Sequence, residues 1–120
     1  MDIYRQKILD HYKYPHNFGN LKDADITQTL YNSACGDKIT MQVKFGKDKK
    51  TITDIRFSGE GCAISQASSS LLTDHVKGMK KETVVNLKKE VVIKLLGTSL
   101  TPSRIKCALL PLEVLQKCMC

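Results

Sequence analysis

The spacing of apolar residues along the chain predicts one helix, then three strands, then further helices. Residues 2–14 carry apolar and aromatic side chains at intervals of four, which is typical of an amphipathic helix, and Pro15 and Gly19 then interrupt the pattern. Residues 25–32 are a weak strand candidate. Apolar and polar residues alternate over 39–45, and this alternation indicates a strand with one buried face.

A third strand is predicted over residues 52–57, after a turn at 46–50 that is rich in glycine, lysine and aspartate. Ile52 and Ile55 are three residues apart, which breaks the alternation of apolar and polar residues and predicts a β-bulge near Thr53. Three strands with short connections favour an antiparallel meander. The fold class that we expect is therefore α+β, with a three-stranded antiparallel sheet and helices packed on one face.

The second half of the chain has helical periodicity. One helix is expected to follow residue 62 and to end near Gly78, and a second is predicted over 84–97 and closed by its final glycine. We expect residues 98–106 to form a loop around Pro102. A last helix then carries leucines toward the C-terminus, with Pro111 in its first turn, where the missing backbone N–H costs little.

Composition and charge narrow the class of protein. A chain of 120 residues, 42% hydrophobic and 26% charged, fits one domain spanning residues 1–120, and it has no apolar run long enough for a membrane span. The N-terminus lacks the features of a signal peptide, so we expect a cytoplasmic protein. The net charge of +7 comes from scattered lysines without interleaved aromatic residues. This pattern favours a solvated basic surface over a nucleic-acid site.

Five cysteines in a chain without a secretion signal favour metal or sulfur chemistry over a disulfide framework. Cys62 is the most informative of them, because it follows the turn Gly59-Glu60-Gly61 and precedes a predicted helix. Glycine permits a sharp turn and a close approach of the backbone, and a helix N-terminus favours the thiolate form of cysteine. Cys62 is thus a candidate metal ligand or nucleophile.

Two more cysteines are expected at the ends of elements. Cys35 lies in a turn between the first two strands, Asp37 follows two residues later, and Cys107 is expected at the start of the last helix. Three thiolates and a carboxylate suit Zn²⁺ or the iron of an iron–sulfur cluster. There is no Cys-x-x-Cys pair, and buried cysteine is often only a small apolar residue. Spacing alone therefore leaves a metal site and plain core cysteines both open.

The remaining candidates have simpler interpretations. We expect Cys118 and Cys120 to be spare thiols on a mobile chain end. His11 and His16, around the end of the first predicted helix, are interpreted as helix-surface or capping residues rather than catalytic ones. His75 is interpreted as a satisfied helix residue rather than a ligand.

Four segments together resemble one known family. They are Ile8-Leu9-Asp10-His11-Tyr12, Ser33-Ala34-Cys35-Gly36-Asp37, Phe57 to Ser70, and Arg104-Ile105-Lys106-Cys107-Ala108. In this order they are similar to the NifU N-terminal-domain family, which includes the iron–sulfur cluster assembly proteins of the IscU and SufU type. The resemblance implies an α+β fold in which Cys35, Asp37, Cys62 and Cys107 gather at one exposed end.

The resemblance also implies a function. Proteins of this family accept sulfur from a pyridoxal-phosphate cysteine desulfurase, and either build a transient [2Fe–2S] cluster for recipient apo-proteins or, in a zinc-bound branch, relay the sulfur. Cys107 matches the usual sulfur acceptor, while Cys35, Asp37 and Cys62 would hold the metal or the cluster. Such a protein is a scaffold or a sulfur carrier rather than a conventional enzyme.

The chain combines features of both branches. Lys106 stands where the scaffold branch has histidine, as in the zinc-bound branch, yet the connection 97–104 is too short for that branch's insertion. The chaperone-binding Leu-Pro-Pro-Val-Lys stretch is only partly matched by Leu100-Thr101-Pro102-Ser103-Arg104, which argues against recognition by the dedicated Hsp70-type chaperone. The alternative from a different class is a structural zinc-binding module with a basic partner-binding surface.

Overall fold

The computed structural model describes residues 3–33 and 36–119, so Cys35 and Cys120 lie outside the described residues. In chain order the elements are α1 (Ile3–Lys13), β1 (Ile26–Asn32), β2 (Asp37–Phe45), β3 (Ile52–Glu60), α2 (Ala63–Val76), α3 (Lys81–Val85), α4 (Lys89–Leu96) and α5 (Pro102–Cys118). None of the helices within these ranges is both long and apolar enough to cross a membrane.

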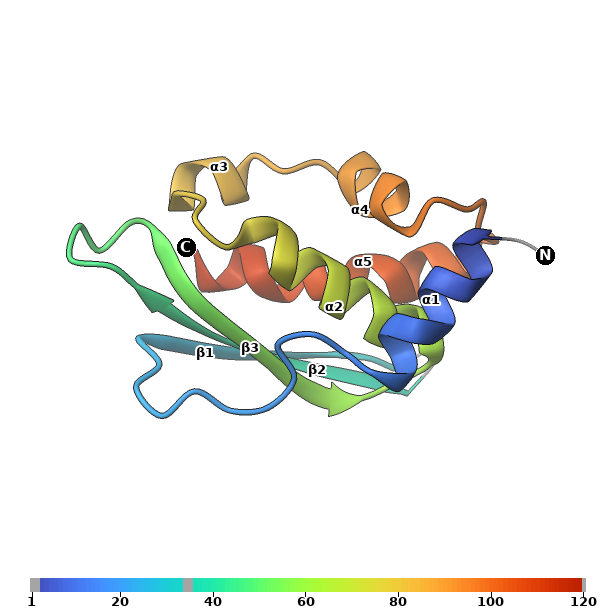
Figure 1. The fold of residues 1–120 in the computed structure, drawn as a ribbon, viewed down its shortest axis with the longest axis horizontal. Coiled ribbons are helices and arrows are strands. Elements are labelled where there is room, and N and C mark those ends of the chain that lie inside the picture. Colours follow the sequence, from blue (N-terminus) through green and yellow to red (C-terminus); the bar gives the residue numbers. More distant parts are fainter. Residues whose placement is uncertain (1–2, 34–35, 120) are drawn as a thin grey trace.

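The strands form one antiparallel sheet in the order β1-β2-β3, and the helices cover one of its faces (Figure 1). The predicted fold class and meander are confirmed. Ile39, Met41 and Val43 of β2 are buried at alternate positions, as the period of two requires. Near the turn that joins β2 to β3, Lys44 pairs with Asp54 and Phe45 pairs with Ile52, so the register skips Thr53. The register shift confirms the predicted bulge.

Helices α2 and α5 lie side by side on the sheet and form the middle of the molecule (Figure 1). Helix α2 buries polar as well as apolar residues, including Ser65, Ser68 and Ser69. These serines are tolerated because their hydroxyls are hydrogen-bonded: Ser69 Oγ donates to the Ser65 carbonyl at 2.8 Å, and Ser68 Oγ donates to the Ala108 carbonyl of α5 at 2.6 Å. Small side chains also let the two helices approach closely.

The single helix predicted over 84–97 is wrong, because two helices, α3 and α4, occupy this part of the chain. Asn86 ends α3, and its side-chain amide donates to the Glu82 carbonyl at 2.8 Å. This local bond competes with continuation of the helix. Gly97 closes α4 in the left-handed conformation, with φ of 73°, as expected.

The loop predicted over residues 98–106 is also wrong, because α5 begins at Pro102 with Thr101 as its N-cap residue. The N–H that proline lacks would have no partner within the helix at the first helical position, so proline can start the helix here instead of breaking it. Two further expectations change as a result. Cys107 lies in the second turn of α5 rather than at its start, and Pro111 lies inside the helix rather than in its first turn.

Cys118 is not a spare thiol on a mobile end. It is 2% exposed in the last turn of α5, and its Sγ lies 3.9 Å from the Met41 carbonyl oxygen of β2. Burial raises the pKa of the Cys118 thiol to about 12, because the apolar surroundings disfavour the thiolate. Cys118 is a core residue.

Candidate metal centre

Three predicted site residues come together where the sheet meets α2 and α5. Asp37 is the first residue of β2, Cys62 immediately precedes α2, and Cys107 lies on α5. One ligand atom from each, a carboxylate oxygen and two sulfurs, lie within 4.8 Å of one another. Among the described residues, this is the one group of three or more Cys, His, Asp or Glu side chains with such spacing. Cys35, the fourth predicted ligand, lies outside them.

Two glycines make this convergence sterically feasible, each in a different way. Gly59 has φ of 135°, and a Cβ placed on it would lie 1.9 Å from the Lys38 carbonyl oxygen of the adjacent strand. A Cβ on Gly61 would lie 2.8 Å from Asp37 Oδ1 and 2.4 Å from Ser65 Oγ. The close backbone approach that the Gly-Glu-Gly turn predicts is therefore confirmed at both positions.

Asp37 is fixed by the backbone that carries Cys62. Its Oδ1 accepts the Cys62 backbone N–H at 2.9 Å, while the Cys62 thiol points at Oδ2 with a separation of 3.8 Å. Asp37 is only 1% exposed, so this hydrogen bond helps to offset the cost of burying a carboxylate. One oxygen positions the side chain, and the other faces the sulfur atoms.

The start of α2 orients Cys62. Cys62 has an extended backbone, with φ of −70° and ψ of 168°, and its carbonyl accepts hydrogen bonds from the Gln66 backbone N–H at 3.1 Å and from Ser65 Oγ at 3.1 Å. No side chain caps this helix end by a hydrogen bond. The Cys62 side chain therefore occupies the N-cap position, where helix dipoles favour negative charge.

Cys107 and Asp37 are more enclosed than expected. Cys107 is 4% exposed and Asp37 is 1% exposed, whereas Cys62 is partly exposed, so the expectation of an exposed site is wrong for two of the three residues. The physical reason is the packing of α5 on α2, which is held next to the site by the hydrogen bond from Ser68 to Ala108. This bond places Cys107 on the inward side of α5.

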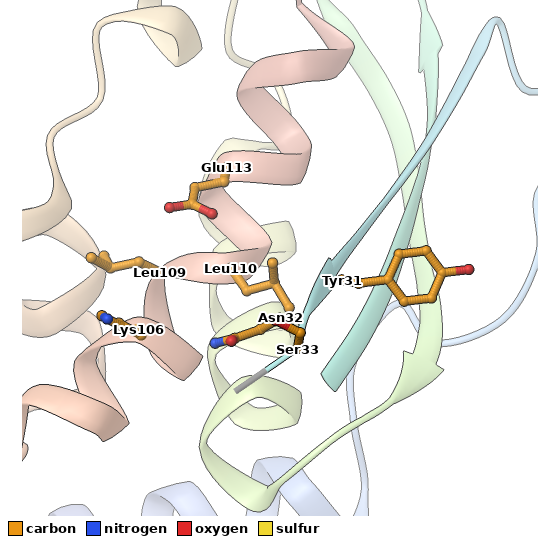
Figure 2. A pocket seen from close by; sticks show the side chains of 7 residues that line it. All are labelled: Tyr31, Asn32, Ser33, Lys106, Leu109, Leu110 and Glu113. Carbon is orange, nitrogen blue, oxygen red and sulfur yellow. The ribbon is translucent and has the colours of Figure 1, made fainter. Parts of the chain in front are cut away.

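A groove of about 320 Å³ opens beside the site, between the end of β1 and α5 (Figure 2). Tyr31 lines it from β1, Ser33 lines it from the residue after that strand, and Lys106 and Glu113 line it from the helix. Lys106 directly precedes Cys107 in the chain and is exposed, so the groove has one basic and one acidic side chain on its α5 side.

The donor set fits a metal ion with mixed soft and hard ligands. Thiolate sulfur and carboxylate oxygen together suit Zn²⁺ and iron, whereas Mg²⁺ and Ca²⁺ prefer oxygen ligands alone. The sequence interpretation missed the supporting roles of Ser65 and Ser68. A run of serines inside an otherwise core-forming helix is the signal that could have found them, because buried hydroxyls need partners.

The histidines also differ from their sequence interpretation. His75 lies on α2, as the prediction of a helix residue requires, and it is exposed. His16 and His11, however, form hydrogen bonds with Asp74 and Ser70 of α2, which are more than fifty residues away in the chain. Distant partners of this kind cannot be identified from local sequence.

Comparison with known proteins gives one consistent result. The model of the NifU-like N terminal domain family matches residues 3–120. The zinc-dependent sulfurtransferase SufU of Bacillus subtilis is 38% identical, over 96% of this chain and 88% of its own length. The iron–sulfur cluster assembly scaffold protein IscU of Aquifex aeolicus is 38% identical, over 93% of this chain and 71% of its own.

Solved structures agree with the sequence relatives. The crystal structure of FiSufU from Fervidobacterium islandicum AW-1 superposes with a TM-score of 0.80 at 27% identity, covering 96% of this chain and 95% of that one. The N-terminal NifU-like protein of Brucella abortus, at 21% identity and a TM-score of 0.76, shares the fold. The chain belongs to the NifU-like N-terminal domain family.

Proposed function

We propose that this protein assembles iron–sulfur clusters, accepting sulfur from a cysteine desulfurase and either building a transient [2Fe–2S] cluster or passing the sulfur on. The observation that carries the proposal is the grouping of Asp37, Cys62 and Cys107 within 4.8 Å. Relatives that match most of the chain are named as a scaffold for cluster assembly and as a zinc-dependent sulfurtransferase. The proposed partners that receive the cluster or the sulfur are recipient apo-proteins.

The metal-binding residues of the proposal are Cys35, Asp37, Cys62 and Cys107. Zinc bound there would hold the thiols as thiolates and act as a Lewis acid. Iron and sulfide, by contrast, are cargo that the same residues collect and release. The buried carboxylate of Asp37 is a weaker, harder ligand than the thiolates, which makes it suited to exchange when cargo enters or leaves.

Cys107 is the proposed sulfur acceptor. Its thiolate attacks the outer sulfur of a donor persulfide, a new S–S bond forms at Cys107, the donor's S–S bond breaks, and the donor cysteine leaves as a thiolate. The outer sulfur carries its own proton to Cys107, so charge and protons balance without an added oxidant. Lys106, which precedes Cys107 in the chain, supplies positive charge that favours the thiolate on either side of this transfer.

Access to Cys107 requires movement of the first turns of α5. Residues 101–104 are exposed, and no side-chain hydrogen bond caps this helix end. The firm anchor comes just after Cys107, where Ser68 binds the Ala108 carbonyl at 2.6 Å. Fraying of the helix up to that anchor would carry Cys107 toward the donor and leave the rest of α5 in the core.

The relatives differ in length, but this difference does not follow their named activities. The alignment with SufU runs over 132 positions yet covers 96% of a chain of 120 residues, so SufU contains residues that this chain lacks. The alignment with IscU runs over 112 positions. The relative named as the scaffold protein IscU of Streptococcus pyogenes also aligns over 132 positions. Alignment length therefore does not separate the two activities, and one experiment has to test both.

The test is anaerobic reconstitution with iron, cysteine and a desulfurase, followed by measurement of iron, acid-labile sulfide and sulfur bound to the protein. We expect the parent protein to take up sulfur and the Cys107→Ser variant to take up at least about 100-fold less, since serine forms no persulfide. Cys118→Ser is the matched control, because it changes the same residue type on the same helix away from the site.

The result also separates the proposal from a purely structural zinc module. Closed zinc sites hold their thiols and accept no sulfur. Equal sulfur uptake by the parent and Cys107→Ser proteins would refute the assigned acceptor, and tightly held zinc with no sulfur uptake by the parent would favour the structural module.

A further inference from the structure

We propose that His11 and His16 form a second metal site, separate from the thiol site, that takes one borderline divalent ion such as Zn²⁺, Ni²⁺ or Cu²⁺ through the two Nε2 atoms. Imidazole nitrogen is a common ligand for these ions. The proposal does not depend on the function assigned to the cysteines.

The two rings lie close together with their Nδ1 atoms occupied. His16 Nδ1 lies 2.5 Å from Asp74 Oδ2, and His11 Nδ1 lies 2.7 Å from Ser70 Oγ. Neither Nε2 atom has a partner among the described residues. A histidine that donates its Nδ1–H to a carboxylate or another oxygen presents an Nε2 lone pair, which is the usual arrangement of a metal ligand.

The spacing of the rings fits a shared ion. Their centroids are 4.6 Å apart, and the ring planes are inclined by 52°. Two imidazoles that bind one ion at Zn–N distances of about 2.0–2.1 Å place their centroids roughly 4.5 Å apart at a right angle and roughly 5.2 Å apart at the tetrahedral angle. The observed separation therefore permits binding without a large movement of either ring.

The surrounding hydrogen bonds hold this pair in place. The Asn17 side-chain amide donates to Asp74 Oδ1 at 2.8 Å and to Thr73 Oγ1 at 2.9 Å. The His16 backbone N–H donates to Ser70 Oγ at 2.8 Å. Because a hydroxyl oxygen has two lone pairs, Ser70 Oγ can also accept the Nδ1–H of His11. His11, His16 and the adjacent Asn17 are thus each tied to α2 by hydrogen bonds.

The electrostatic environment is also suitable. Burial and the neighbouring His16 lower the pKa of His11, so its ring is neutral at neutral pH. The carboxylate of Asp74 supplies negative charge beside the pair, and hydrogen bonds from His16 and Asn17 outweigh the effect of burial and keep the pKa of Asp74 below its usual value. A divalent cation placed between the rings would therefore meet the neutral ring of His11 and a nearby negative charge.

This pair is distinct from the thiol site. Ser70 follows Cys62 by eight residues on α2, which corresponds to about 12 Å along a helix. Its donors are nitrogen only, so it has no special affinity for the soft ions that thiolates select. The site would bind an ion in addition to the occupant of the cysteine site.

The experiment is an NMR titration of full-length, ¹⁵N-labelled protein with zinc, starting from protein whose thiol site already holds one equivalent. We expect the Nε2 signals of His11 and His16 to shift together and to saturate at one further zinc per chain. The exposed His75 on α2 is an internal control whose signals should stay in place over the same range. No shift at His11 and His16, or a shift that follows His75, would overturn the proposal without reference to any variant.

Variants sharpen the result. His16→Gln should abolish the coupled shift of His11, and Asp74→Asn should weaken zinc binding about tenfold, as expected for the partner that orients a ligand. His75→Gln is the matched control and should leave the titration unchanged. Undiminished zinc binding in His16→Gln would contradict a site shared by the two rings.

Discussion

Helix α5 carries two buried cysteines, Cys107 and Cys118, whose surroundings differ. Cys107 is 4% exposed and lies with a carboxylate and a second thiol, those of Asp37 and Cys62. Cys118 is 2% exposed and lies in the apolar core against β2, with its pKa raised to about 12 by burial. Burial is therefore nearly the same at the two positions. What distinguishes a candidate ligand from a core residue is the polar groups that surround it.

The largest effect is expected from the turn that brings the site together. Gly59→Ala places a Cβ 1.9 Å from the Lys38 carbonyl oxygen, in a backbone conformation that alanine rarely adopts. We expect a loss of about 4 kcal/mol in the free energy of unfolding, since neither strand can yield easily. Chemical denaturation of the purified variant measures this loss.

Gly78→Ala is the matched control at the opposite end of α2. Gly78 also has a positive φ, of 87°, but a Cβ there would meet nothing within 4 Å. The expected cost is only the backbone strain, about 1–2 kcal/mol. Equal losses in the two variants would mean that the contact with Lys38 is not what requires glycine at position 59.

The second expected effect concerns the reactivity of the thiols. In metal-free protein at pH 8, Cys118 should react with iodoacetamide at least about 100-fold more slowly than the partly exposed Cys62, because its thiol is protonated and shielded. Mass spectrometry of peptides from timed samples gives both rates from one protein. Comparable rates would place Cys118 outside a well-packed core, in conflict with the structure.

The sequence predicted the sheet well because alternation is a local signal. The β2 pattern and the phase slip before Ile55 require no knowledge of distant contacts, and both agree with the structure. The grouping of Asp37 with Cys62 was also accessible, since both residues lie at predicted ends of elements. The glycines in the turn before Cys62 also predicted a close backbone approach at this site.

The helical half was harder to predict for physical reasons. Pro102 can either break a helix or start one, and only the packing of α5 on α2 shows that it starts this helix. The apolar repeat that begins at Val84 is interrupted by Asn86, whose competing hydrogen bond is a matter of geometry rather than periodicity. Cys118 was assigned to a mobile end by its position in the chain, whereas its burial depends on tertiary contacts with β2.

A smaller effect is expected from the hydrogen bond that anchors α5 beside Cys107. Ser68→Ala removes the donor to the buried Ala108 carbonyl and should lower the free energy of unfolding by about 1–3 kcal/mol. It should also speed alkylation of Cys107, because fraying of α5 can then extend past this position. The exposed Ser103 on the same helix offers the control Ser103→Ala, with an expected change within about 0.5 kcal/mol.

Measured per pH unit, the smallest effect comes from the titration of Cys118. The folded-state pKa of Cys118 lies above its ordinary value of 9.0. The buried neutral thiol therefore contributes fully to the stability of the folded state below pH 9, and this contribution is lost as the pH rises toward 12. The free energy of unfolding should fall by at most about 1.4 kcal/mol per pH unit from this group. Cys118→Ala should be less stable at neutral pH but show a shallower fall above pH 9. An equally steep fall in that variant would assign the slope to other groups.

The most direct test of the metal centre is X-ray absorption at the zinc edge on protein loaded with one equivalent of zinc. We expect three sulfur ligands at about 2.3 Å and one oxygen ligand at about 2.0–2.2 Å, from Cys35, Cys62, Cys107 and Asp37. Cys107→Ser should lower the sulfur count by one, and Cys118→Ser should leave it unchanged. A first shell made only of nitrogen and oxygen would contradict the central claim that these cysteines hold the metal.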